Sequence, residues 1–311
     1  MKYINLAKWS TLGILAAGVV YLSAFREAEH SPKGEVIDHQ YQEHVGENYK
    51  VFSLPTPSDV TFCGQPVPME KFGVREKLDR ELLVNTYWHS NTFLSFKRAN
   101  RYFPEIEAIL KEEGVPEDFK YLAMVESGLT NAVSPAGARG FWQFMKTTGK
   151  NYGLEINDQV DERYHLEKAT RAACEYLKDS YEVYGDWALV AASYNMGVGG
   201  VNKQLKRQKV DSYWDLLLNE ETGRYVYRIL AVKEILNNSS DYGFVIRPKD
   251  LYEPYKLQTI EVDSTVGSWV DFAIEQGTTY NALKTLNPWI RNGALTNKTK
   301  KVYEVQLPSE E

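Results

Sequence analysis

The feature that most constrains the fold is a helical period of apolar residues that runs from Val74 to Leu236. Segments such as VREKLDRELLVNTYW and YFPEIEAILKEEG carry apolar residues at steps of three and four, which is the spacing of one helix face. The second segment ends at Gly114, and Gly128 follows a further helix that begins near Pro116. Because no stretch of this region alternates as a strand does, we predict an all-α domain.

The pattern changes after Pro248. KLQTIEV and KVYEVQLP alternate like strands, and the second places Tyr303, Val305 and Leu307 on one face. Between them, GSWVDFAIEQG and TYNALKTLN have the apolar spacing of short helices. We therefore predict a mainly α protein in which a helical domain, residues 56–250, precedes a small βααβ module.

The N-terminal segment predicts where the protein is located. Residues 9–25 carry no charge and follow a positively charged flank, and as a helix they would span about 25 Å, slightly less than a bilayer core. We predict that residues 1–26 are an uncleaved membrane anchor and residues 27–55 a polar spacer. A cleaved signal is the alternative, although a cut after Ala24 would leave Leu22 where a small residue is preferred. The position of the charged flank places the body outside the cytoplasm, in the periplasm or cell envelope.

Composition argues against several partners. The net charge of −6 and the lack of a Lys/Arg stripe disfavour nucleic acid. The histidines are scattered without metal-ligand spacing, so we predict neither a metal site nor a cofactor. Cys63 and Cys174 could pair outside the cytoplasm, or Cys174 could be a small buried residue on a helix face.

One carboxylate stands alone in an unusual stretch. Residues 124–145 contain Glu126 as their only acid, and the next acid is Glu155. Phe119, Leu122 and Glu126 share one helix face, so the carboxylate points toward the core. Burial and the negative end of the helix dipole both raise its pKa, which suits a general acid at neutral pH. The structural alternative is a buried glutamate that only holds backbone hydrogen bonds.

The motifs VESGLTNAVSPAGARGFWQFM, VDERY, AASYNMG, YWDL and ETGRYV resemble, in order and spacing, the soluble lytic transglycosylase-like (goose-lysozyme-like) catalytic domain. The likeness covers residues from about 75 to 238 and is strongest to the membrane-bound lytic murein transglycosylase D group, which adds C-terminal LysM modules. It implies a lysozyme-like fold and cleavage of the β-1,4 bond between N-acetylmuramic acid and N-acetylglucosamine in peptidoglycan, leaving 1,6-anhydro ends.

By this resemblance Glu126 is the single catalytic residue, first an acid toward the bridging oxygen and then a base toward the muramyl C6 hydroxyl. Ordinary glycosidases use two carboxylates. Here the attacking oxygen belongs to the sugar itself, so the second carboxylate, which would activate water, is dispensable.

Further positions match residues that shape the family's cleft. The resemblance implies a serine that hydrogen-bonds near the glutamate, two cleft-lining residues, a tyrosine–asparagine pair at the sugar site, and a tyrosine facing the carboxyl: Ser134, Gln143, Met145, Tyr194, Asn195 and Tyr225. Each has a structural alternative; Tyr225, for example, also continues an apolar helix stripe. Ser134 lies one residue closer to Glu126 than the family pattern places it.

Residues 251–311 resemble a degenerate LysM module. GTTYNALKTLNPWI is close to the family pattern, whereas the opening segment has become DSTVGSWVDFA. We expect weak binding to peptidoglycan glycan strands, with a purely structural cap as the alternative.

Two other functions remain open. A lysozyme-type hydrolase would need a second carboxylate, and the candidates are Glu155, Asp158, Asp161 and Glu162. A non-catalytic scaffold would bind glycan through both domains. Glu126 argues against the scaffold, because a binding module gains nothing from a buried ionisable group.

Overall fold

The computed structural model describes residues 51–309 together with positions 40, 43 and 46. The chain divides into two units, Met1–Ser53 and Leu54–Glu311, of which the second holds every element discussed below. The predicted anchor and most of the predicted spacer lie outside the described residues. Within the described part, none of the helices combines the length and hydropathy needed to cross a bilayer.

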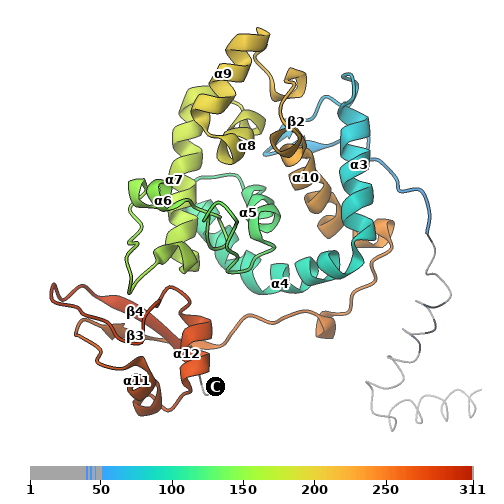
Figure 1. The fold of residues 1–311 in the computed structure, drawn as a ribbon. Coiled ribbons are helices and arrows are strands. Elements are labelled where there is room, and N and C mark those ends of the chain that lie inside the picture. The colour runs from blue at the N-terminus through green and yellow to red at the C-terminus, as the bar shows by residue number, and fades with distance from the viewer. Residues whose placement is uncertain (1–39, 41–42, 44–45, 47–50, 310–311) are drawn as a thin grey trace, which may run out of the picture. The chain divides into compact units, whose positions relative to one another are not determined.

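The predicted mainly helical fold is confirmed (Figure 1). The principal helices of the larger domain are α3 (Val74–Tyr87), α4 (His89–Glu112), α5 (Phe119–Ser127), α6 (Lys146–Asn151), α7 (Leu166–Tyr184), α8 (Trp187–Met196), α9 (Val198–Gln208) and α10 (Glu220–Asn237). Short 3-10 helices lie at Glu162–Tyr164, Tyr213–Asp215, Ser239–Tyr242 and Pro248–Asp250.

Helix α5 lies in the middle of this domain and packs against α4 and α10 (Figure 1). It ends as predicted at Gly128, whose left-handed conformation (φ 61°) lets its N–H bond the carbonyl of Met124. The predicted start of α5, near Pro116, is too early. Pro116 lies in a turn in which its carbonyl accepts a hydrogen bond from the N–H of Phe119, and α5 begins at Phe119.

Two features before α5 differ from the prediction. Helix α4 begins at His89 rather than near Tyr102, because its first turns bury the polar side chains of Thr92 and Ser95, which interrupt the apolar period. A hairpin of β1 (Thr61–Phe62) and β2 (Gln65–Pro66) precedes α3; strands this short carry no readable alternation.

The C-terminal module has the predicted βααβ order: β3 (Leu257–Val262), α11 (Trp269–Glu275), α12 (Tyr280–Leu286) and β4 (Tyr303–Pro308). The strands pair antiparallel, with Val262 opposite Tyr303 and Leu257 opposite Pro308. Tyr303, Val305 and Leu307 are buried, which confirms the predicted inner face.

This module is held against the segment that joins α6 to α7. The N–H of Asp161 donates to the carbonyl of Trp289 (2.9 Å), and Lys301 pairs with Glu155 (2.6 Å) and Glu162 (3.3 Å). The module's core cluster also includes side chains from this segment. The helical domain and the βααβ module are therefore packed together. The exact boundaries of the two domains stay a prediction.

Candidate active site

Glu126 lies in the last turn of α5 with a half-buried side chain. Loss of solvent raises the pKa of its carboxyl from the ordinary 4.5 to about 7. The hydrogen bond from Tyr225 and the charge of Arg228 pull this pKa down, while the nearby Glu221 pushes it up. The carboxyl can therefore give and take a proton near neutral pH.

Tyr225, on α10, donates its hydroxyl hydrogen to Oε1 of Glu126. Its ring is buried in the core, and burial together with the charge of Glu126 holds the pKa of the phenol well above its usual range. The residue is thus both the core position that its helix stripe indicates and a partner of the carboxyl.

Tyr194 and Asn195, at the end of α8, connect the site to its surroundings. The Tyr194 hydroxyl donates to the carbonyl of Trp142 (2.8 Å). Burial and, to a smaller extent, the charge of Glu126 hold the pKa of this tyrosine well above its usual range. Asn195 accepts a hydrogen bond from Thr222 (2.7 Å) and donates to Glu221 (3.2 Å), which ties α8 to α10.

The remaining predicted residues, Ser134, Gln143 and Met145, lie in the loop that follows α5. The Ser134 hydroxyl accepts from the N–H of Ala138 (3.0 Å), and Gln143 donates to the carbonyl of Gly140 (2.8 Å). Among the described residues, neither side chain hydrogen-bonds Glu126. Met145, immediately before α6, is 44% exposed. Ser134 and Gln143 thus shape the loop.

Sequence reasoning missed the ion pair that supports this loop. Arg163 is buried and binds both carboxylate oxygens of Asp161 (2.9 and 2.7 Å). Its remaining nitrogen donates to the carbonyls of Gly137 and Phe144 (both 3.2 Å). Because both carbonyls belong to the loop, the Arg163 guanidinium holds the loop in position.

Gly140 is required by the same close packing. Its φ is +77°, and a Cβ atom there would lie 1.9 Å from the backbone oxygen of Arg163. We expect Gly140→Ala to lower the free energy of unfolding by at least about 2 kcal/mol, measured by urea denaturation. Gly137→Ala is the control, because Gly137 also has a positive φ but faces open space. Equal losses in the two variants would contradict the close-approach argument.

Most of the acids proposed for a second carboxylate are engaged elsewhere. Glu155 pairs with Lys301, and Glu162 pairs with Lys168 (2.5 Å) and Lys301. The third, Asp161, is the buried partner of Arg163 described above. Asp158 is exposed.

Two charged residues near Glu126 were also missed. Glu221 and Arg228 flank Tyr225 on α10 and both act electrostatically on the Glu126 carboxyl. The sequence held a signal for them: positions 221, 225 and 228 follow the i, i+4, i+7 spacing of one helix face.

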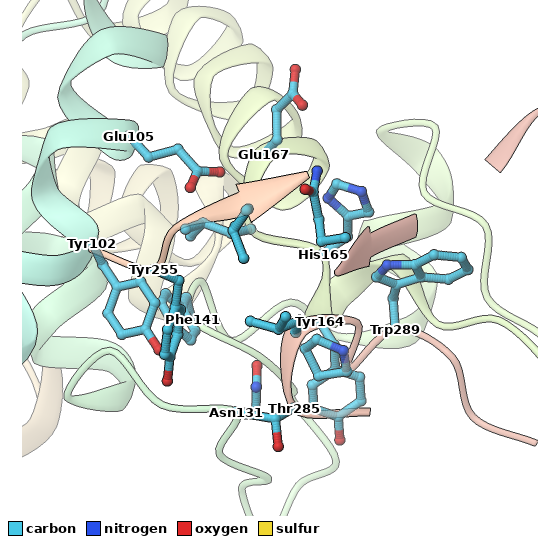
Figure 2. Close-up of a pocket in the computed structure, with 15 residues that line it drawn as sticks. Tyr102, Glu105, Asn131, Phe141, Tyr164, His165, Glu167, Tyr255, Thr285 and Trp289 are labelled. Atoms are coloured by element: carbon cyan, nitrogen blue, oxygen red, sulfur yellow. The ribbon is translucent and has the colours of Figure 1, made fainter. Parts of the chain in front are cut away.

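Two cavities bear on function. One, of about 290 Å³, is lined by Val125 and Ser127 on either side of Glu126. The other, of about 150 Å³, lies at the joint with the C-terminal module (Figure 2). Trp289 in the second cavity is covered by stacked His165 and Tyr303 (ring centroids 6.0 and 5.6 Å away), so this ring is part of the joint rather than a free stacking platform.

The two cysteines are free thiols in the structure, so the pairing considered from the sequence is not formed. Cys174 is buried in α7, as the alternative interpretation expected. Burial raises the pKa of both thiols, which keeps them protonated.

Comparison with known proteins identifies both folded parts. Residues 103–217 match the transglycosylase SLT domain, and residues 258–311 match the soluble lytic transglycosylase C-terminal LysM-like domain. The chain is 32% identical to membrane-bound lytic murein transglycosylase D of Escherichia coli K12 over 243 residues, which are 75% of this chain and 52% of that protein. The same protein of strain CFT073 gives equal values. The chain thus spans about half the length of these curated relatives.

Solved structures of lytic transglycosylases show distant similarity. An inactive mutant of lytic transglycosylase Slt from Pseudomonas aeruginosa is 20% identical, with a TM-score of 0.38 over 49% of this chain and 26% of that one. The 70 kDa soluble lytic transglycosylase from Escherichia coli is 17% identical, with a TM-score of 0.40 over 59% and 35%. The helical domain is therefore similar to the transglycosylase SLT domain over residues 103–217, and the module behind it is similar to the LysM-like domain of soluble lytic transglycosylases.

Proposed function

We propose that this protein is a peptidoglycan lytic transglycosylase that cleaves the N-acetylmuramic acid–β-1,4–N-acetylglucosamine bond and leaves 1,6-anhydro ends. The observation that carries the proposal is the Glu126 carboxyl, whose pKa is raised to about 7 by burial and which accepts the Tyr225 hydroxyl. The similarity of residues 103–217 to the transglycosylase SLT domain and of the chain to a lytic murein transglycosylase supports the same reaction class.

In the proposed reaction, protonated Glu126 gives its proton to the bridging oxygen while the bond from that oxygen to C1 of the muramyl residue breaks. The resulting carboxylate takes the proton of the muramyl C6 hydroxyl, whose oxygen forms the new bond to C1. Glu126 ends protonated again, and no water is consumed. The hydrogen bond from Tyr225 holds the carboxyl and stabilises its charged form between the two steps.

The neighbouring residues have supporting roles in this proposal. Tyr194 and Asn195 frame the sugar site through their bonds to Trp142 and Glu221. Met145 lines the cleft with its exposed side chain, while Ser134 and Gln143 set the shape of the loop beside it.

The role of Tyr225 predicts a change in pH dependence. Its hydrogen bond lowers the pKa of Glu126, so Tyr225→Phe should raise that pKa further. Because the acid must be protonated, activity falls as pH rises through this pKa, and the alkaline limb of the pH–rate profile should move to higher pH. Loss of a bond to a charged group should also slow the reaction by roughly 10- to 100-fold. The profile of kcat/KM against pH measures both effects.

Tyr227→Phe is the matched control for this prediction. Tyr227 lies on the same helix, is buried, and has a hydroxyl with no hydrogen-bond partner among the described residues. Its removal should leave the alkaline limb in place. An unmoved limb in Tyr225→Phe would contradict the proposed coupling.

A lysozyme-type hydrolase is the second candidate, because Glu221 is a further carboxylate whose charge acts on the Glu126 carboxyl. Digestion of sacculi in heavy-oxygen water decides between the two reactions. A hydrolase incorporates the label at the new reducing end, whereas transglycosylation consumes no water. We expect unlabelled products.

Location and domain roles complete the proposal. The curated relatives are named as membrane-bound, and residues 1–26 of this chain have the pattern of an anchor. We place the protein in the cell envelope, where this segment tethers it to the membrane. Residues 56–250 form the catalytic domain, and residues 251–311 bind glycan strands weakly. Removal of residues 1–26 should release the protein from the membrane fraction, which fractionation tests directly.

A further inference from the structure

The cavity of about 290 Å³ beside Glu126 has walls from α3, α4, α5 and α10, from Trp88 between α3 and α4, and from the start of the loop after α5. Its lining contains Val125 and Ser127, the two sequence neighbours of Glu126, together with Arg228, whose charge acts on the Glu126 carboxyl. The cavity therefore adjoins the last turn of α5, which carries Glu126.

The cavity is positively charged. Two of its lining residues, Arg98 and Arg228, are basic and none is acidic, in a chain whose net charge is −6. Arg98 is fixed in place by the bond from its Nη1 to the carbonyl of Gly128 (3.1 Å). The rest of the wall is neutral, with apolar side chains and small amides and hydroxyls.

Arg228 has unused hydrogen-bonding capacity. Its Nε atom is buried and has no hydrogen-bond partner among the described residues. A guanidinium has five N–H donors, and the other nitrogens of Arg228 are the ones that can meet a ligand in the cavity that this residue lines. A guanidinium is suited to a carboxylate, which it binds with two parallel hydrogen bonds.

The chemistry of the proposed substrate supplies such an anion in one place. The intact glycan strand offers neutral hydroxyl and acetamido groups, and its muramyl lactyl group is used up in an amide bond to the peptide. The peptide stem carries free carboxylates. A neutral sugar subsite would not require two guanidinium groups in a wall without acids.

We infer that this cavity binds a carboxylate of the peptide stem on a muramyl residue next to the scissile bond, with Arg98 and Arg228 as its partners. The inference rests on the proposed function, because it takes peptidoglycan as the substrate. It follows that the protein prefers glycan that carries stems to glycan from which the stems have been removed.

Calorimetric titration tests this preference without turnover in the Glu126→Gln protein. Three probes are compared: a reduced disaccharide with its tetrapeptide stem, the same compound with its peptide carboxylates amidated, and the peptide-free disaccharide. The stem-bearing compound should bind at least about tenfold more tightly than the other two. Equal Kd values for the native and amidated compounds would overturn the inference, and this comparison needs no arginine variant.

Substitution locates the site. In the same background, Arg98→Gln and Arg228→Gln should each reduce the preference about tenfold, whereas Arg98→Lys and Arg228→Lys should keep part of it. Arg207→Gln is the matched control, because Arg207 is exposed on α9 and does not line the cavity. A preference that survives both glutamine substitutions would assign the stem to another surface and overturn the inference.

Product analysis of the wild-type protein keeps the two proposals separate. If no anhydro products form but the preference for the charged stem is measured, the proposed reaction fails and the stem site stands. If anhydro products form and the preference is absent, the reaction stands and the stem site fails.

Discussion

Glu126→Gln is expected to slow the release of anhydro products by at least about 10³-fold, because an amide can neither donate nor accept the transferred proton. The substitution keeps the shape of the side chain, and the amide oxygen can still accept the Tyr225 hydroxyl. Release rates from purified sacculi, compared at equal protein concentration, measure the loss. A variant that keeps a tenth of the activity would show that another group supplies the proton.

The stability of the same variant separates lost chemistry from lost folding. The pKa of Glu126 in the folded chain, about 7, lies above its ordinary value of 4.5. The folded state therefore favours the protonated form, and the stability this brings is lost as pH rises through 7. At about pH 8 the wild type must bury a carboxylate that the variant lacks.

We expect Glu126→Gln to be more stable than the wild type at about pH 8, by up to about 3 kcal/mol, with the difference shrinking as pH falls toward 4.5. Urea denaturation at the two pH values measures it. A variant that is less stable at about pH 8 would mean that the carboxylate is stabilised in the fold, against the desolvation argument.

The second large effect concerns the support of the loop. Asp161→Asn removes the charge that compensates the buried Arg163, and both side chains are only 4% exposed. Breaking a buried ion pair on one side costs about 3–5 kcal/mol, because the remaining charge stays without its partner. The free energy of unfolding from urea denaturation should fall by that amount.

An exposed ion pair provides the comparison. Lys71 and Asp215 are 2.6 Å apart, as close as the buried pair, but each side chain is 39% exposed. Asp215→Asn should change the free energy of unfolding by less than about 1 kcal/mol. Similar losses in Asp161→Asn and Asp215→Asn would show that burial does not decide the cost of breaking these pairs.

The sequence predicts the fold correctly where one face of a helix or strand is uniformly apolar. The helix from Val74 and the inner face of Tyr303–Pro308 follow such patterns and were predicted. Helix α4 was only half predicted, because Thr92 and Ser95 are buried on the face where the period requires apolar residues. Tertiary packing covers these polar groups, and no local pattern records that.

The sequence predicts those site residues that share one face of a helix. The raised pKa of Glu126 follows from its place in an apolar stripe, and desolvation is its largest cause, as expected. Glu221 and Arg228 share a face with Tyr225 and could have been found in the same way. The contact of Gly140 with the Arg163 backbone could not, because it joins segments whose approach no spacing encodes.

Mass spectrometry of the muropeptides that residues 27–311 release from purified sacculi tests the proposed reaction, with Glu126→Gln in parallel. We expect products lighter by one water than reducing-end muropeptides, and we expect them to be absent with the variant. Reducing-end products from the wild type would contradict it, because water would then be the group that reaches C1.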